Sequence, residues 1–507
     1  MTGVRPAMSW LHSWLGLILG WLLFVMFVTG SCGYYRHEIT QWMTPELQPL
    51  AGAAVEDVVA ARRGVDWLAV HAPGAEHWTI TLPDERSPAL RVAWESGDPG
   101  TESRETLDPR NGQPLRPAPR ETRGGEFLYR LHSDLHFIPA IAGRVIVSLA
   151  GIALLVILVS GLFTHRNIIR NLFRFRRGKG RRTWLDAHNL FGVLALPFHL
   201  LVTYTGLVTV MILIMPWGIV SNYAGEGLSG FARDAFEQTA EPSAGPGQPS
   251  ALVPIEQVMS AARGHWRGDH VGEIRIDYPG NTRARIEVAH DIRGVLAMRK
   301  PAITFSGTTG KPLATANEDL SSAALLHSQA FGLHVAHFAG PVTRLSLFLL
   351  GLIGAAMVAT GLIIWSMKRS RSLDEQRPPL SIRLVETLNL GVIAGLPVAI
   401  GAYLWANRII PTNMTQRAAL EINAFFWAWA AAIVLGAIIP VRWKWSSIFA
   451  AAGLMLSTAP MPELMTARTF GGVDSALALA GSAMIYAAYR MLSKDHAKTS
   501  SEGFASN

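Results

Sequence analysis

The chain alternates between long apolar runs and long polar segments. A helix needs roughly 20 consecutive apolar residues to cross about 30 Å of hydrocarbon. Eight runs approach or reach that length, so each predicts a membrane-spanning helix, although the seventh is short and ends in Ala-Pro-Met-Pro. The runs lie near Trp10–Tyr35, Ile138–Phe163, Leu190–Trp217, Val342–Trp365, Leu388–Trp405, Ile422–Ile439, Ile448–Pro460 and Val473–Ala488.

Two long polar segments separate the first four runs, at about residues 36–131 and 221–326. Both mix helical and strand-like spacing. In the second, Pro254–Arg263 has the apolar spacing of a helix, whereas Glu273–Asp277 and Ala284–Val288 alternate as strands do. We therefore expect a small α+β domain in each polar segment.

Basic residues concentrate in the short loops between the predicted spans. These loops would all be cytoplasmic if the N-terminus is cytoplasmic, which is the positive-inside pattern. Both termini are then cytoplasmic, and both polar segments lie on the outer side. The basic clusters occupy residues 166–182, 368–383 and 442–444, and residues 490–498 beyond the last span.

Composition agrees with a membrane protein. Of the 507 residues, 50% are hydrophobic and only 16% are charged, against about 25% charged in a soluble domain. The loops account for the net charge of +8, so nucleic acid is not an expected partner and the lipid bilayer is. The single cysteine, Cys32, excludes an intrachain disulfide framework, a cysteine-based zinc site and an iron–sulfur cluster.

Internal similarity divides the part of the chain before position 371 into two copies of one unit. The motif from His12 to Gly16 recurs from His188 to Gly192. The Ser-Gly-Leu at 160–162 recurs as the Thr-Gly-Leu at 360–362. We therefore predict a duplicated unit of helix, outer domain and helix, spanning 1–187 and 188–370, whose four helices form one bundle. A four-helix extension, 371–507, follows.

Histidines gather at both ends of these spans. Both copies of the unit start and end on one side, so equivalent residues face each other across a pseudo-two-fold axis. Ionisable side chains inside membrane helices usually face the bundle interior and have a function. Hydrogen bonding to a neighbouring helix is the alternative, and for His199, whose equivalent is Leu23, the two interpretations are equally open. The inner ends hold His12 and His188, and the outer ends hold His132, His136, His327, His334 and His337.

Paired imidazoles from facing helices suit a haem iron, which takes two axial ligands and leaves the porphyrin in an apolar slot. Zinc would usually recruit a carboxylate or thiolate, and the spans offer almost none. No CxxCH motif is present, so the haem would be of the b type. We predict two haems, one held by His12 and His188 and the other by His136 and His334.

Several residues remain as alternatives at these sites. The possible alternative axial ligands are His132, His327, His337 and His199. Arg144 and Arg344 are possible partners of the haem propionates, and anchoring of the topology accounts for them equally well.

These motifs together resemble the family of PepSY-associated transmembrane helix proteins, also called iron-regulated membrane proteins. The resemblance covers about residues 8–370 and rests on the two His-x-x-x-Gly motifs, on Tyr129–His136 and on the stretch from Leu326 to Leu362. It implies PepSY-like periplasmic domains and a place in the bacterial inner membrane. Members include siderophore reductases that bind b haems and reduce ferric iron in the periplasm.

The resemblance thus implies a haem-dependent ferric-chelate reductase whose electron acceptor is a ferric siderophore or another ferric chelate. The electron donor, a quinol or a cytosolic reductase, is left open. Two other functions also remain open, namely a membrane-anchored PepSY module that binds or regulates a partner, and a transporter. The extension has no histidine before His496, so we expect it to bind no haem.

Overall fold

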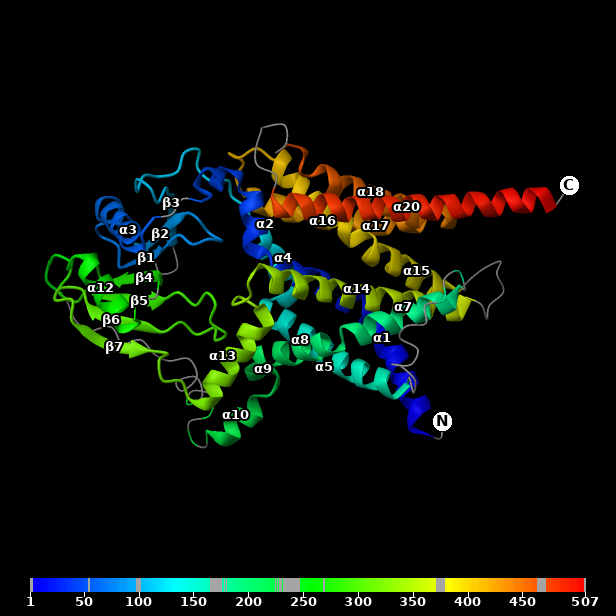
Figure 1. Cartoon of the computed structure of the whole chain (residues 1–507), viewed down its shortest axis with the longest axis horizontal. Helices are drawn as coiled ribbons and strands as arrows, with labels where there is room; N and C mark the ends of the chain where they lie inside the picture. The colour runs from blue at the N-terminus through cyan, green and yellow to red at the C-terminus, as the bar shows by residue number, and fades with distance from the viewer. Residues whose placement is uncertain are drawn as a thin grey trace. The chain divides into compact units, whose positions relative to one another are not determined.

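The structure is a computed structural model of the whole chain (Figure 1). Contacts divide the chain into two compact units. The helical unit comprises Met1–Met43, Glu121–Leu207 and Thr343–Asn507, and the sheet unit comprises Thr44–Arg120 and Val208–Val342. The description covers all residues except 1–2, 53–54, 97–101, 165–175, 177, 179, 224, 226, 228–229, 231–246, 268–269, 371–378, 463–470 and 506–507.

Long apolar helices form the first part of the helical unit. They are α1 (Val4–Gly33), α5 (Ala140–Thr164), α14 (Pro341–Ser370) and the pair α7 (Arg181–Leu194) and α8 (Leu196–Thr209). Helices α7 and α8 meet at an angle of 62°. Pro197 follows this break directly, and its ring has no N–H to continue the helical hydrogen bonding.

The C-terminal extension adds a further group of helices to this unit. Helices α18 and α20 run side by side (Figure 1), and their backbones approach closely at Gly453 and Gly481. Such small residues are typical of helix interfaces in membranes. The helices are α15 (Leu380–Ile393), α16 (Gly395–Ile409), α17 (Arg417–Ile438), α18 (Val441–Thr458) and α20 (Gly472–Ala505).

Among the described residues, five helices are long and apolar enough to cross a membrane, and the bent pair makes six. They are α1, α5, α14, α17 and the continuous stretch Leu380–Ile409 that holds α15 and α16. The multi-pass membrane architecture is therefore confirmed. The seventh and eighth predicted spans are helical, as α18 and α20, but their membrane crossing stays a prediction. The basic clusters that predict the orientation lie partly in 165–175 and 371–378, outside the described residues.

The sheet unit contains one antiparallel sheet of seven strands, in the order β3-β2-β1-β4-β5-β6-β7. The first three strands come from the first polar segment, and the last four come from the second. Strands β1 and β4 pair directly and join the two segments into a single sheet, whereas the sequence predicts a separate domain in each segment. The strands are β1 (His77–Thr81), β2 (Leu90–Glu95), β3 (Glu102–Leu107), β4 (Val271–Asp277), β5 (Arg285–His290), β6 (Ala302–Ser306) and β7 (Pro312–Ala316).

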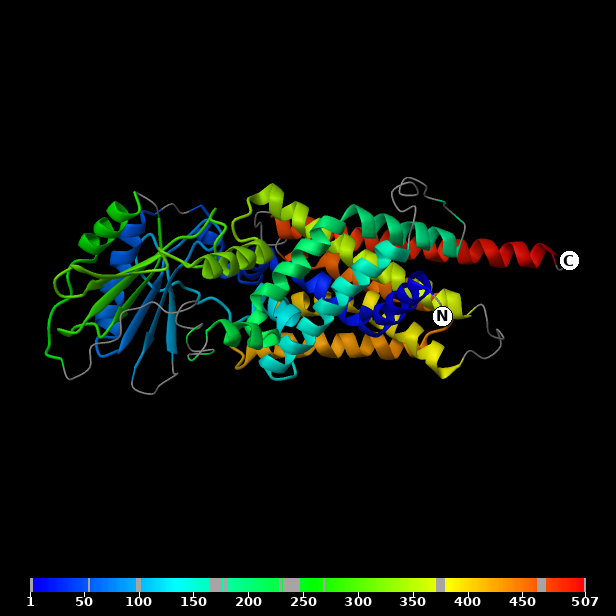
Figure 2. The same cartoon turned by 90° about the horizontal axis from the view of Figure 1, so that it is seen from below.

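One face of this sheet is covered by two helices, α3 (Asp57–His71) and α12 (Ile255–His265) (Figure 2). Successive side chains of a strand point to opposite faces of a sheet, so alternating apolar residues give the sheet one apolar face for the helices to cover. In β1, Trp78 and Ile80 are buried in the core beneath the helices, and in β4 the same holds for Ile274 and Ile276. The predicted helix at 254–263 and the two predicted strands correspond to α12, β4 and β5.

Short helices complete both units. In the helical unit, α2 (Arg36–Met43) and α4 (Gly124–Ser133) pack against each other, and α4 also packs on α1. The sheet unit includes η1 (Pro45–Leu50), α9 (Met211–Ile214), α10 (Pro216–Asn222) and α13 (Ser322–Val335). Helix α4 ends just before the outer-side residues Asp134 and His136, and α13 holds His327 and His334.

Candidate functional site

The two predicted inner ligands lie next to each other inside the helical unit. The ring centroids of His12, on α1, and His188, on α7, are 6.2 Å apart, and the ring planes are nearly perpendicular at 82°. Both side chains are half-buried. The structure thus brings together the histidines of the two His-x-x-x-Gly motifs, which lie far apart in the sequence.

Each of these imidazoles is held by a carbonyl on a neighbouring helix. Nδ1 of His12 donates to the carbonyl oxygen of Ile157 on α5 at 2.9 Å, and Nδ1 of His188 donates to that of Met357 on α14 at 2.8 Å. Because a carbonyl can only accept, the proton of each neutral ring lies on Nδ1. Nε2 is then the deprotonated nitrogen, as a metal ligand requires.

The same contacts recur at equivalent positions of α5 and α14. Ser160 follows Ile157 by three residues, and Thr360 follows Met357 by three residues. The hydroxyl oxygen of Ser160 lies 3.3 Å from Nδ1 of His12, and that of Thr360 lies 3.3 Å from Nδ1 of His188. A glycine also faces each ring. A Cβ on Gly161 would lie 3.3 Å from Cε1 of His12, and one on Gly361 would lie 3.1 Å from Cε1 of His188.

The spacing of this pair is compatible with a haem that takes two axial histidines. An iron bound by two imidazoles at about 2.0 Å each places their ring centres roughly 6 Å apart, close to the observed centroid separation of 6.2 Å. Both rings are in the Nδ1–H form and are oriented by backbone acceptors. The assignment of His12 and His188 as axial ligands of a haem stays a prediction.

His132, which the sequence predicts to lie on the outer side, has a similar arrangement. It lies near the C-terminal end of α4, and its Nδ1 donates to the carbonyl oxygen of Met26 on α1 at 2.9 Å. A Cβ on Gly30 of α1 would lie only 2.8 Å from this nitrogen, so the ring packs directly on the glycine. Burial lowers the pKa of His132, against the opposing effect of the Met26 hydrogen bond. The ring is therefore neutral at neutral pH, as a ligand must be.

His136 lies in different surroundings. It is exposed, and its ring stacks on Phe426 of α17 with centroids 5.3 Å apart and planes at 21°. Phe127 contacts the same ring edge to face at 5.8 Å. The side chain of His136 therefore packs on the extension through an aromatic cluster.

The remaining outer histidines belong to the sheet unit. His327 and His334 lie on α13, and His337 follows the left-handed residue Ala336 that ends this helix. A Cβ on Gly332 would lie 3.3 Å from Cε1 of His337. The pairing of His136 with His334 joins residues of different units and stays a prediction.

His199 is fully buried at the start of α8. Its ring packs edge to face against Phe27 of α1, with centroids 5.3 Å apart, and Nε2 would lie 3.0 Å from a Cβ on Gly354 of α14. Neither ring nitrogen makes a hydrogen bond of good geometry within the described part of the chain. A buried polar group without such a bond is costly, so this imidazole is the least satisfied histidine of the bundle interior.

Carboxylates accompany both arginines that the sequence offers as propionate partners. Arg144 donates through Nε to Asp134 at 2.9 Å, and Arg344 donates to Glu38 of α2 at 2.8 Å. These ion pairs tie the outer ends of α5 and α14 to the segments beside them. The described contacts of both arginines therefore support a structural role.

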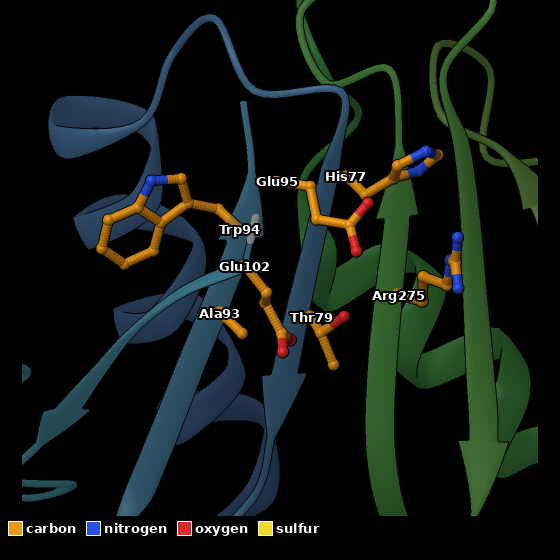
Figure 3. Close-up of a pocket in the computed structure, with 7 residues that line it drawn as sticks. All are labelled: His77, Thr79, Ala93, Trp94, Glu95, Glu102 and Arg275. Carbon is orange, nitrogen blue, oxygen red and sulfur yellow. The ribbon is translucent and has the colours of Figure 1, made fainter. Parts of the chain in front are cut away.

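A small polar pocket lies on the sheet face opposite the helices (Figure 3). His77 of β1 and Arg275 of β4 both bond to Oδ1 of Asp277, at 2.7 and 2.9 Å. Glu95 and Glu102 line the same pocket. Its volume of about 30 Å³ is enough for a small ion or water and far too small for a porphyrin or an iron chelate.

Within the part of the chain that the structure describes, no group of three or more His, Cys, Asp or Glu side chains could hold a bare metal ion. A haem iron takes four of its ligands from the porphyrin and only two from the protein.

Comparison with known families identifies the chain. The family model described as the PepSY-associated TM region matches residues 9–368. The protein belongs to this family. The match confirms the resemblance found in the sequence and ends within α14, so the extension lies outside it. Both His-x-x-x-Gly motifs and all the outer histidines lie inside it.

The chain also resembles a protein of Pseudomonas aeruginosa. The chain is 26% identical over 386 residues to an uncharacterized protein of that organism, and the alignment covers 71% of this chain and 93% of the relative. Because that protein is itself uncharacterized, the likeness indicates no activity.

Proposed function

We propose that this protein is an inner-membrane oxidoreductase that binds two b haems and passes electrons from the cytoplasmic side to a ferric chelate of the siderophore type in the periplasm. The observation that supports it best is the inner pair. His12 and His188 lie 6.2 Å apart between ring centroids, and each Nδ1 is bonded to the carbonyl at the equivalent position of α5 or α14.

The protein's own contribution at the inner site is orientation and tautomer control. The carbonyls of Ile157 and Met357 fix the ring planes and keep the proton on Nδ1. Such second partners of ligating histidines change metal affinity about 10–100-fold when they are lost. Haem, when bound, supplies one-electron redox chemistry whose potential depends on axial ligands, burial and nearby charge.

For the outer site we propose His132 as the ligand from the first half of the chain. It shares the carbonyl bond and the glycine contact of the inner pair, whereas the ring of His136 packs on Phe426. The second ligand stays a prediction from the sequence, which offers His327, His334 and His337 for it. His199, buried between α1 and α14, remains an alternative for either site.

The reaction consumes one electron for each iron. A ferric chelate takes up the electron and becomes a ferrous chelate, and no bond of the chelator breaks. Fe²⁺ has a lower charge density, so oxygen donors hold it less tightly and release it. The electron comes from a reductant on the cytoplasmic side, either a quinol or a reduced cytosolic protein.

The decisive experiment is a haem count on the purified full-length protein. We expect a red preparation with about two haems per chain by pyridine haemochrome, low-spin bands that shift on dithionite reduction, and reoxidation of the reduced protein by a ferric chelate. A colourless preparation from haem-replete cells would contradict the proposal. It would favour the regulatory module or the transporter.

Histidine variants then assign the ligands. His12→Ala and His188→Ala should each remove one haem and leave the other. His132→Ala should remove the second haem, whereas His136→Ala should leave both. His270→Ala is the matched control, because His270 is exposed and bonded to Asp57 in the sheet unit. Retention of both haems in His12→Ala would refute the inner assignment.

A further inference from the structure

The C-terminal extension contains a fully buried ion pair. Arg417 and Glu421 lie one turn apart on α17, are both 0% exposed, and are bonded to each other. Buried charges cost free energy, and replacing such a pair by apolar residues is often neutral or stabilising. The pair is therefore not explained by stability alone, and its other partners indicate what it does.

Those partners lie at the start of α4. The hydroxyl of Thr122 donates to Oε2 of Glu421 at 2.6 Å, and Arg417 donates to the carbonyl oxygen of Glu121 at 2.9 Å. Tyr403 of α16, also 0% exposed, donates its hydroxyl to the carbonyl oxygen of Gly124 at 2.9 Å. Three side chains of the extension thus bind one short segment, 121–124.

The hydroxyl of Thr122 also orders the first turn of α4. It accepts a hydrogen bond from the backbone N–H of Gly124 at 3.0 Å while it donates to Glu421. Gly124 has φ +51°, and a Cβ there would lie 2.8 Å from the Cα of Thr40 on α2. Only glycine suits this position. The first turn of α4 is therefore held by Thr122 and the extension on one side and by the close contact with α2 on the other.

A second branch of the network reaches α2. Asn407 donates to Oε1 of Glu421 at 2.7 Å, and Arg408 donates to the side-chain oxygen of Asn407 at 2.6 Å. The guanidinium of Arg408 also donates to the carbonyl oxygen of Trp42 at 2.8 Å and lies 3.9 Å above the centre of its indole ring. Helices α2 and α4, which pack on each other, are both bound to the extension.

From these contacts we infer that the C-terminal extension positions His132, by fixing the start of α4 through the buried network of Thr122, Tyr403, Asn407, Arg417 and Glu421. This inference rests on the proposed role of His132 as a haem ligand. Helix α4 has 10 residues, so it is about 15 Å long and transmits a displacement of its first turn to its last. The network residues are positioning residues and do not contact the haem.

The test uses full-length variants that remove one hydroxyl each. Thr122→Val removes the bond to Glu421, Tyr403→Phe removes the bond to Gly124, and Thr122→Ser keeps the hydroxyl and should restore wild-type behaviour. Thr458→Val is the matched control, because the hydroxyl of Thr458 bonds only within its own helix, α18. Each variant is examined for haem content, reduction potentials and hydrogen exchange of the α4 amides.

The haem of His12 and His188 serves as an internal reference. We expect Thr122→Val and Tyr403→Phe to lose half or more of the outer haem or to shift its potential, with the inner haem unchanged and Thr122→Ser like the wild type. Equal loss of both haems would indicate general destabilisation and overturn the inference. Unchanged outer haem in both variants would overturn it as well.

Hydrogen exchange separates this inference from the proposed function. In haem-free protein, the amides of 124–133 should exchange at least several-fold faster in Thr122→Val than in Thr458→Val, because opening of α4 becomes easier. Equal rates would refute the positioning role. A wild type that binds no haem would contradict the proposed function. If exchange of the α4 amides were then fast only in Thr122→Val, the conclusion that the extension fixes the start of α4 would still be supported.

Discussion

Gly30 lies directly against the imidazole of His132, and a Cβ at this glycine would come within 2.8 Å of Nδ1. That distance is too short for two non-bonded atoms, so Gly30→Ala must displace the ring or separate α1 from α4. We expect the variant to lose the hydrogen bond to Met26, worth about 1 kcal/mol. Haem affinity at the outer site should fall about 10–100-fold, as for loss of a second partner of a ligating histidine, measured by titration with haem.

Other glycines of the bundle provide a graded series for the same measurement. A Cβ on Gly161 would lie 3.3 Å from His12, a contact that a small ring movement relieves, whereas Gly16 has nothing within 4 Å. Gly161→Ala should shift the inner potential without loss of haem, and Gly16→Ala should change neither. A large loss at Gly16 would show that the alanine acts through helix packing in general.

The ion pair of Asp134 and Arg144 predicts a pH dependence of stability. Burial by itself would raise the pKa of Asp134, but hydrogen bonds from Arg144, Ser133 and Arg130 outweigh it and lower this pKa below its ordinary value. Since the folded pKa lies below the unfolded one of about 3.9, the stabilisation is complete above the unfolded pKa and is lost as the pH falls through the folded pKa.

The check is thermal unfolding in detergent of the wild type and of Asp134→Asn, at several pH values from 6 to 3. The difference in melting temperature should be largest at pH 6 and shrink toward pH 3, because below the unfolded pKa of about 3.9 the unfolded chain takes up a proton and gains stability relative to the folded state. A difference that is constant over this range would mean that the ion pair does not contribute through the charge of Asp134.

The proximity of His12 and His188 could be predicted from the sequence because their motif repeats. His12 and His188 share a motif at one depth of two similar helices, and duplication implies that equivalent residues meet near a common axis. Their carbonyl partners, Ile157 and Met357, could not be found in this way, since any residue of α5 and α14 offers a carbonyl. Only the fold selects which one each ring reaches.

The surroundings of His132 and His136 were harder to predict, because sequence spacing does not report how α4 approaches α1. His136 precedes Arg144 by eight residues, much as His334 precedes Arg344 by ten, so the sequence places the two histidines at similar distances from the matched arginines. The ring of His136 nevertheless packs on Phe426 of the extension. The continuous sheet was missed for a similar reason, since the pairing of β1 with β4 joins two segments that lie far apart along the chain. Such non-local contacts leave no periodic signal in either segment.

The buried network of α17 leaves one signal in the sequence. Arg417 and Glu421 lie one helical turn apart at the edge of an apolar run, where charges are costly and usually paired. What the sequence does not reveal is their partner, because Thr122 lies 299 residues away from Glu421. The contacts between the extension and the start of α4 are therefore visible only in the fold.

Trp42 and Asp474 form a second link between α2 and the extension. The indole N–H of Trp42 donates to Oδ1 of Asp474 at 2.6 Å, and both residues are buried. Trp42→Phe leaves this carboxylate one donor short, so we expect a loss of about 1–3 kcal/mol in stability. Limited proteolysis and thermal unfolding measure it, and Trp427→Phe, at an exposed position of α17, is the control that should change neither.

The packing of α18 on α20 depends on two glycines whose backbones touch. A Cβ on Gly481 would lie 2.5 Å from both the carbonyl oxygen of Gly453 and the backbone N of Ser457, and backbone atoms cannot move aside as a side chain can. Gly481→Ala must therefore separate the two helices. We expect a loss of about 1–3 kcal/mol, the usual cost of overpacking, in thermal unfolding.

A matched variant isolates this contact from the effect of alanine on helix formation. Gly472 lies at the start of the same helix and has nothing within 4 Å of its Cβ position, so Gly472→Ala should leave stability unchanged or raise it slightly. If Gly481→Ala were equally harmless, the two helices would not pack as closely as their glycines allow. A clear loss at Gly481 alone would show that direct backbone contact holds α20 against α18.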